Sequence, residues 1–187
     1  CFVILWYEGK MYGLNSSGPA PKSLSVAALK DRGFEKIPSY GVEPIDVPGA
    51  VAGWMTLHER FGKLPLEEVM APAICYAEEG YPVTPNISRL WQEAFENYSK
   101  YRDRSEFQGW FDTFAPNNTW LKPGEMFRCP DMAKTLREIA ATKGESFYRG
   151  AIAEKIDAFF KKHNGFLTKE DLAAFKPEWV DPISVNY

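Results

Sequence analysis

Residues 47–81 constrain the fold most, because every local signal in this stretch predicts two helices folded back on each other. Pro48 fixes φ, and Gly49 allows either a close backbone approach or a positive φ, so the chain turns before the first helix. Gly62 is expected to end this helix in a left-handed conformation, and Pro65 begins the second helix. Two apolar stripes with helical period support this interpretation: Val51, Trp54, Met55, Leu57 and Phe61, then Val69, Met70, Ala73, Ile74 and Ala77.

Strand-like segments flank the helical part of the chain. Residues 2–7 form an apolar, β-branched and aromatic run, which predicts a strand buried on both faces. Residues 11–15 return as the second strand of a hairpin, and residues 178–187 alternate like a further strand. Both ends therefore fall inside predicted core strands. We expect residues 1–187 to be a single partial domain of a larger protein, although a small domain with strand termini would show the same pattern.

The segment between the strands is predicted to be mostly helical. A short helix is expected to be capped by Ser23, and the Pro-rich residues 36–48 form a connector. The aromatic residues 102–125 lack a period and predict a loop or a broken helix. The other expected helices cover residues 84–101, 129–144, 145–162 and 168–175. Thr84 is expected to cap the first of these, and Thr168 to begin the last with a capping box. This order favours an α+β class, with a helical layer inserted between strands of one sheet.

The first apolar stripe is expected to cover the sheet that carries strands 2–7 and 11–15. Its function would be that of a scaffold. If Trp54 is buried there, Trp54→Ala should cost about 3–5 kcal/mol of stability. Cys75 lies on the second stripe and is expected to be a buried thiol.

The chain carries few signals of independent chemistry. Its formal net charge of −3 favours neither nucleic acid nor an anionic membrane as a partner, and no apolar run approaches the length of a membrane span. Three cysteines without CxxC spacing predict neither a disulfide framework nor a zinc site. His58 lacks the HExxH pattern, and no phosphate-binding or GxSxG motif occurs. We therefore predict no cofactor and no metal.

The loop from Ser16 to Pro21 is the best candidate for contact with a substrate. It is rich in hydroxyl groups and glycine and follows a predicted core strand, where backbone N–H groups often meet ligands. A tight connection between elements is the alternative, and the residues alone favour it slightly.

Several blocks, taken together and in this order, resemble the large-subunit region of the gamma-glutamyltransferase family. They are CFVILWYEGKMYGLNSSGPAP, VPGAVAGW, HERFGKLPLEEVMAPAICYAEEGYPV, KPGEMF, DMAKTLREIA, FYRGAIAEKI, GFLTKEDLAAF and VDPISVNY. The resemblance covers almost the whole chain and implies part of an N-terminal-nucleophile fold, an αββα sandwich made as a self-cleaving proenzyme. It also implies that an N-terminal Thr of the small subunit attacks the gamma-glutamyl amide, with its own amine as base. That Thr would lie beyond Tyr187, so the resemblance places no catalytic residue in this chain.

The resemblance makes Ser16, Ser17 and Gly18 the expected substrate-binding residues and the small subunit the expected partner. Typical members hold the glutamyl α-carboxylate with an Arg three residues before an Ala-Pro pair; here Ala20-Pro21 matches the pair and Ser17 stands at the Arg position. A hydroxyl cannot replace a bidentate guanidinium. This departure argues against glutathione as the main substrate. It favours the hydrolase or acylase branch of the family, whose members include cephalosporin and glutaryl acylases. A non-catalytic helical interaction domain is the alternative of another class. Nothing in the sequence predicts the compartment.

Overall fold

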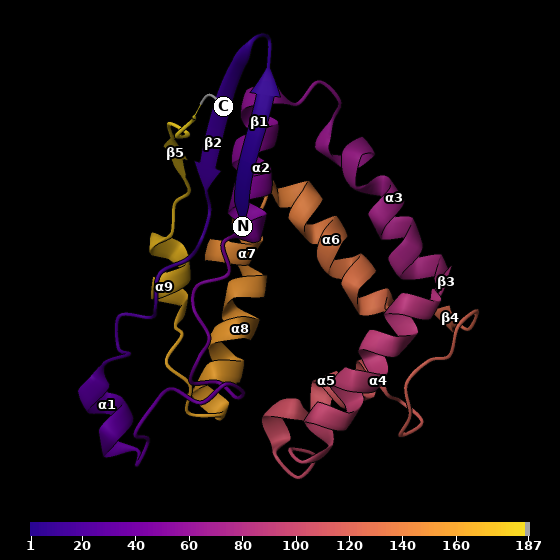
Figure 1. Cartoon of the computed structure of the whole chain (residues 1–187). Coiled ribbons are helices and arrows are strands. Elements are labelled where there is room, and N and C mark those ends of the chain that lie inside the picture. The colour runs from indigo at the N-terminus through magenta and orange to yellow at the C-terminus, as the bar shows by residue number, and fades with distance from the viewer. Residues whose placement is uncertain (186–187) are drawn as a thin grey trace. The chain divides into compact units, whose positions relative to one another are not determined.

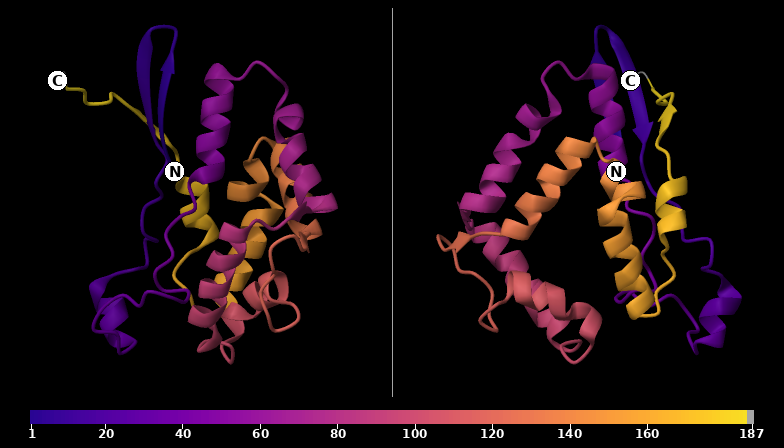
Figure 2. Two further views of the ribbon diagram at one scale, coloured as in Figure 1. Left: turned by 45° about the vertical axis from the view of Figure 1, so that its right-hand side comes forward. Right: turned by 180° about the vertical axis from the view of Figure 1, so that it is seen from behind.

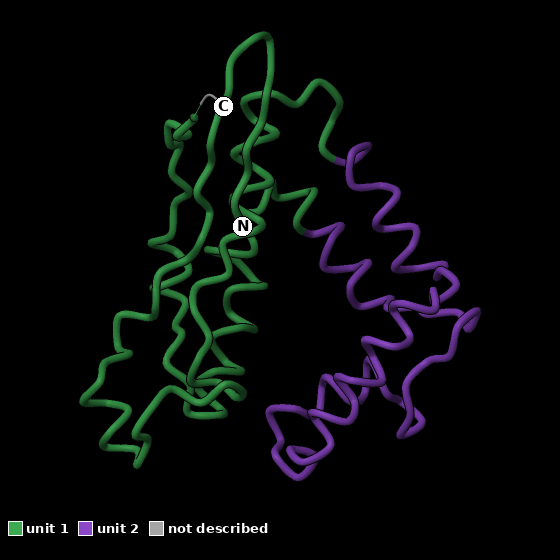
Figure 3. The backbone as a smooth tube through the Cα atoms, in the orientation of Figure 1, with its two compact units in different colours: residues 1–66, 139–187 green, residues 67–138 purple. Residues whose placement is uncertain are grey.

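A computed structural model describes residues 1–185 and divides the backbone into two compact units (Figure 3). Unit 1 comprises residues 1–66 together with the chain from residue 139 onward, and unit 2 comprises residues 67–138. That the chain forms a single partial domain stays a prediction.

Unit 1 contains a three-stranded antiparallel sheet in the order β1-β2-β5 (Figure 1). Its strands are β1 (Phe2–Tyr7), β2 (Lys10–Asn15) and β5 (Glu178–Val180). The turn between β1 and β2 has two residues, Glu8 and Gly9, with φ of 49° and 79°. Positive φ at both positions matches the twist of a tight hairpin. The predicted hairpin is confirmed. The predicted strand 178–187 is shorter than expected, and its last two residues lie outside the described part.

One face of this sheet is covered by helix α2 (Ala50–Phe61), which lies beside the hairpin in both views of Figure 2. The Phe61 ring lies 5.2 Å from the Tyr7 ring and 5.1 Å from the Tyr12 ring, measured between centroids. The opposite face of β1 is open: Phe2, Ile4 and Trp6 are 77%, 75% and 66% exposed. The prediction that residues 2–7 are buried on both faces is therefore wrong for the described chain, because only one layer covers this strand.

Helix α2 differs from the predicted helix at Trp54 and Gly62, and at Gly49 the structure shows one of the two predicted alternatives, the close approach. Trp54 is 46% exposed, so the expected loss of 3–5 kcal/mol for Trp54→Ala does not apply; Val51 and Gly53 are the buried residues. Gly62 has φ −65° and ψ 137°, which is extended and not left-handed. Gly49 has φ −90° and is required for a close approach, since a Cβ there would lie 2.1 Å from the Ser16 carbonyl oxygen.

The remaining helices of unit 1 are α1 (Val26–Asp31), α7 (Glu145–Arg149), α8 (Ala151–Lys162) and α9 (Lys169–Ala174). Ser25, and not Ser23, caps α1. The single helix predicted over residues 145–162 is broken at Gly150, whose φ of −123° and ψ of −149° are not helical. The capping box predicted at Thr168 is confirmed.

Unit 2 is built around packed aromatic rings, most of them in edge-to-face or tilted pairs. It contains β3 (Tyr81–Pro82), α4 (Pro85–Ser99), the 3₁₀ turn η1 (Ser105–Phe107), α5 (Gln108–Phe114) and β4 (Met126–Phe127). Helices α3 (Leu66–Glu79) and α6 (Pro130–Thr142) cross the unit boundaries. The Trp91 ring lies 4.8 Å from Phe127 and 5.7 Å from Phe114, between centroids. The expected broken helix with packed aromatics is confirmed for η1 and α5. On α3, Cys75 is exposed, so the prediction of a buried thiol is wrong.

Among the described residues, no helix combines the length and the apolar composition needed to cross a membrane.

Candidate functional site

The loop of residues 16–21, called loop 16–21 below, begins where β2 ends. Ser16 still pairs with the start of β1: its N–H donates to the Cys1 carbonyl at 2.8 Å, and its own carbonyl accepts from the Cys1 amine at 2.6 Å. The first residue of the loop is thus held by the sheet.

Ser16 is also fixed through its side chain. Its hydroxyl donates to the Gly49 carbonyl at 2.7 Å, and the residue is completely buried. Gly53 makes room for this contact, because a Cβ there would lie 3.0 Å from the Ser16 Oγ. The hydroxyl therefore serves an internal hydrogen bond that joins the loop to the turn before α2.

Gly18 allows the same two segments to touch further along. A Cβ at Gly18 would lie 1.7 Å from the Val47 carbonyl oxygen, a distance that no side chain could accommodate. The Val47 N–H also donates to the Pro19 carbonyl at 3.0 Å. Glycine is thus required at this position by backbone packing.

Ser17 is the member of the three expected binding residues whose side chain faces solvent. Its N–H donates to the Asn15 side-chain oxygen at 3.0 Å, which closes a local turn. No hydrogen-bond partner of the Ser17 hydroxyl is found among the described residues. The structure thus brings the three predicted residues together but gives them different surroundings; their contact with substrate stays a prediction.

Two further residues, neither of them expected there from the sequence, support the loop. The Tyr148 hydroxyl donates to the Pro48 carbonyl at 2.8 Å and accepts from the Ala52 N–H at 2.9 Å. Asp171 accepts the Lys22 N–H at 3.1 Å, at the far end of the loop. Burial raises the pKa of the Tyr148 phenol, and the hydrogen bond from Ala52 acts in the opposite direction. The capping-box pattern identifies Asp171 as a helix residue, but no sequence pattern relates Tyr148 to a turn 100 residues away.

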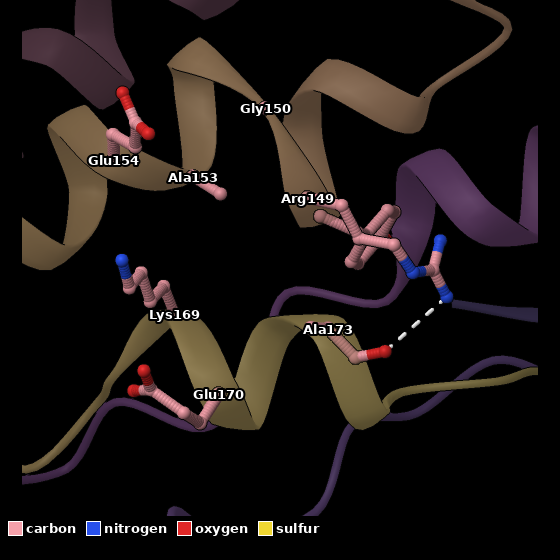
Figure 4. A pocket seen from close by; sticks show the side chains of 8 residues that line it. Arg149, Gly150, Ala153, Glu154, Lys169, Glu170 and Ala173 are labelled. Atoms are coloured by element: carbon pink, nitrogen blue, oxygen red, sulfur yellow. Dashed lines mark hydrogen bonds between the residues drawn. The ribbon is translucent and has the colours of Figure 1, made fainter.

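A cleft between α7, α8 and α9 is a second place where polar side chains gather (Figure 4). Its volume of about 240 Å³ is below the range of common ligand pockets. Arg149 on its wall donates to the Ala173 carbonyl at 3.2 Å and pairs with Glu145 at 3.0 Å. Its cation is therefore already neutralised within unit 1, and the cleft is a weaker candidate than loop 16–21.

The two histidines have structural surroundings. The His58 Nε2 lies 2.8 Å from the Leu64 carbonyl oxygen, and His163 follows the last residue of α8. Within residues 1–185, no three His, Cys, Asp or Glu side chains are grouped so that they could hold a metal ion.

Known proteins resemble the chain in sequence and in structure. Residues 1–187 match the sequence profile of the family described as Gamma-glutamyltranspeptidase. The chain is 34% identical to a glutathione hydrolase proenzyme of Pseudomonas aeruginosa over 189 residues, which cover 100% of this chain and 32% of that protein. It thus spans about a third of the length of this curated relative.

Solved structures are similar over the whole chain. A cephalosporin acylase from Bacillus halodurans is 51% identical with a TM-score of 0.96, and the match covers 100% of this chain and 35% of the acylase. A gamma-glutamyltranspeptidase from Pseudomonas nitroreducens, complexed with L-DON, is 32% identical with a TM-score of 0.86, and the match covers 100% of this chain and 54% of that chain. These neighbours confirm the expected α+β class and its relation to N-terminal-nucleophile hydrolases.

Proposed function

Because the chain belongs to the gamma-glutamyltranspeptidase family, we propose that the protein containing it cleaves gamma-glutamyl or related acyl amide bonds. The nucleophile would be an N-terminal Thr outside this chain. The observation that carries the proposal is the exposed Ser17 hydroxyl between two residues, Ser16 and Gly18, that contact residues 47–49. The family resemblance implies a substrate-binding Arg at this position in typical members. No metal or organic cofactor enters this reaction.

Loop 16–21 would bind the acyl part of the substrate. Ser17 offers one neutral hydroxyl, whereas a guanidinium would offer two charge-assisted hydrogen bonds to a carboxylate. A hydrogen bond to a charged group is worth about 1.5–3 kcal/mol. Substrates that are bound through their α-carboxylate, glutathione among them, should therefore lose this much binding free energy. Acyl groups without an α-carboxylate should lose none. The similarity to the cephalosporin acylase supports an acylase as the second candidate.

The test of substrate contact uses the full-length protein and two 4-nitroanilides. The gamma-glutamyl anilide carries the α-amino and α-carboxylate groups, and the butyryl anilide lacks both. Ser17→Arg should raise kcat/KM for the gamma-glutamyl anilide by about 10- to 100-fold and leave the butyryl anilide nearly unchanged.

Ala20→Arg is the matched control, since it adds the same charge at an exposed position of the same loop. Ala20→Arg should change the ratio of the kcat/KM values for the two anilides little. If Ser17→Arg leaves that ratio as it is in the parent, the loop does not contact the acyl group. A polypeptide of residues 1–187 should hydrolyse neither anilide; turnover by it would contradict the assignment of the nucleophile to another part of the protein.

The open face of β1 supports the proposed partner, the small subunit of the same proenzyme. Phe2 and Ile4 line a groove of about 420 Å³ together with Leu14, Val180 and Ile183. An apolar groove of this kind is typical of an interaction surface. In the full-length protein, Ile4→Glu should prevent cleavage into two subunits, as seen on a denaturing gel. Val26→Glu alters an equally exposed apolar residue on α1 and should leave cleavage intact; equal effects of both variants would refute this use of the groove.

A further inference from the structure

The turn at Pro48-Gly49 is held from two sides by hydroxyl groups. The Ser16 hydroxyl donates to the Gly49 carbonyl at 2.7 Å, and the Tyr148 hydroxyl donates to the Pro48 carbonyl at 2.8 Å. Both acceptors are consecutive carbonyls of one turn. A displacement of the turn must therefore strain both bonds or break one of them.

Tyr148 also bonds to the first turn of α2. Its hydroxyl accepts the Ala52 N–H at 2.9 Å, which is one of the N–H groups that a helix leaves unpaired in its first turn. The Tyr148 ring stacks on the Phe175 ring with 6.0 Å between centroids. The Phe175 ring in turn packs against Gly49, where a Cβ would lie 2.9 Å from it. The turn and the start of α2 are therefore held by the Phe175 ring and by three hydrogen bonds, one from Ser16 and two involving Tyr148.

The same turn fixes loop 16–21. Val47 donates to the Pro19 carbonyl at 3.0 Å, and Gly18 packs on the Val47 carbonyl. Ser17 lies between Ser16 and Gly18, so both of its neighbours rest on residues 47–49. The position of the exposed Ser17 hydroxyl consequently depends on the position of this turn.

We propose that Tyr148 is a positioning residue for the acyl-binding loop, acting through the Pro48-Gly49 turn and Ser16 on Ser17. The inference rests on the proposed function for the identity of the ligand, but the mechanical link between Tyr148 and the loop can be measured without any ligand. Tyr148 is buried, and its proposed effect is exerted through the loop.

The experiment compares Tyr148→Phe, Ser16→Ala and the double variant in the full-length protein. Each change removes a hydroxyl and little volume. Tyr76→Phe and Ser23→Ala are the matched controls: Tyr76 is exposed on α3, and the Ser23 hydroxyl donates to the Phe166 carbonyl beyond the loop.

Amide hydrogen exchange, followed by mass spectrometry, should become about two- to tenfold faster in peptides covering residues 14–20 and 44–52, the factor that one net hydrogen bond is worth. KM for the better of the two anilides should rise by a similar factor, while kcat changes less than about twofold. The double variant should be little worse than the more affected single variant, because the two hydroxyls act on one turn in series.

Unchanged exchange in both peptides of Tyr148→Phe would overturn the inference. Faster exchange with unchanged KM would also overturn it, since the loop would then move without consequence for the substrate. If the parent protein hydrolyses neither anilide, the proposed function fails, and the exchange measurement alone decides whether Tyr148 positions the loop.

Discussion

Replacement of Gly49 by alanine should destabilise the protein, because its missing side chain permits the contact between loop 16–21 and α2. A Cβ at Gly49 would lie 2.1 Å from the Ser16 carbonyl oxygen and 2.9 Å from both the Ser16 carbonyl carbon and the Phe175 ring. Two of these atoms belong to the backbone, so no rotation of a side chain can relieve the clash. The φ of −90° and ψ of −14° are open to alanine, and the cost is therefore steric.

The magnitude follows from three contributions. Overpacking costs about 1–3 kcal/mol. Loss of the Ser16–Gly49 hydrogen bond, once the two segments separate, adds about 0.5–1.5 kcal/mol. The lower entropy of the unfolded chain returns about 0.4–1 kcal/mol. Gly49→Ala should therefore lower the free energy of unfolding by about 0.5–4 kcal/mol, measured by urea unfolding of the full-length protein with tryptophan fluorescence.

Gly109→Ala is the control for this substitution. Nothing lies within 4 Å of a Cβ at Gly109, which is in α5, so alanine should be neutral or stabilise by up to about 1 kcal/mol. If Gly49→Ala and Gly109→Ala give the same free energy of unfolding, the packing of Gly49 against Ser16 does not contribute to stability as the structure indicates.

Three further predictions concern other parts of the chain. Trp54→Ala should cost less than about 1 kcal/mol in urea unfolding, because nearly half of the side chain is exposed; a loss of 3 kcal/mol or more would show that another part of the protein covers it. The hydrogen bond with Glu79 raises the pKa of the Cys75 thiol. Glu79→Gln should therefore speed the alkylation of Cys75 by iodoacetamide near pH 8, measured in a Cys1→Ser, Cys129→Ser background. An equal or slower rate would contradict this cause. The hydrogen bond from Lys161 lowers the pKa of Asp157, so this carboxylate stabilises the fold above its unfolded pKa of about 3.9 and the contribution is lost as the pH falls through the lower folded value. Asp157→Asn should therefore destabilise clearly at pH 7 and much less near pH 2, and a pH-independent difference would refute the assignment.

Local patterns in the sequence predicted the elements well where one turn or one cap decides them. The β1–β2 hairpin, the Thr84 cap of α4 and the Thr168 capping box were all visible as short-range chemistry, and the structure confirms them. Errors arose where a pattern needed long-range information. The apolar run of residues 2–7 predicted two buried faces, but only α2 covers the strand within the described chain. The apolar period of residues 145–162 continued through Gly150, although the backbone breaks there.

The sequence by itself determined the family, because this depends on residue identities at fixed spacing. It also predicted loop 16–21 as the substrate contact, which stays a prediction. Only the tertiary structure separated the roles of Ser16, Ser17 and Gly18, which are adjacent in the chain. Ser16 and Gly18 face the turn at residues 47–49, and Ser17 faces solvent. Their difference depends on contacts with Val47 and Gly49, 29 and 33 positions away, and with Tyr148 behind that turn. Such contacts leave no periodic or local signal, since hydrogen bonds between distant segments are set by how the chain packs.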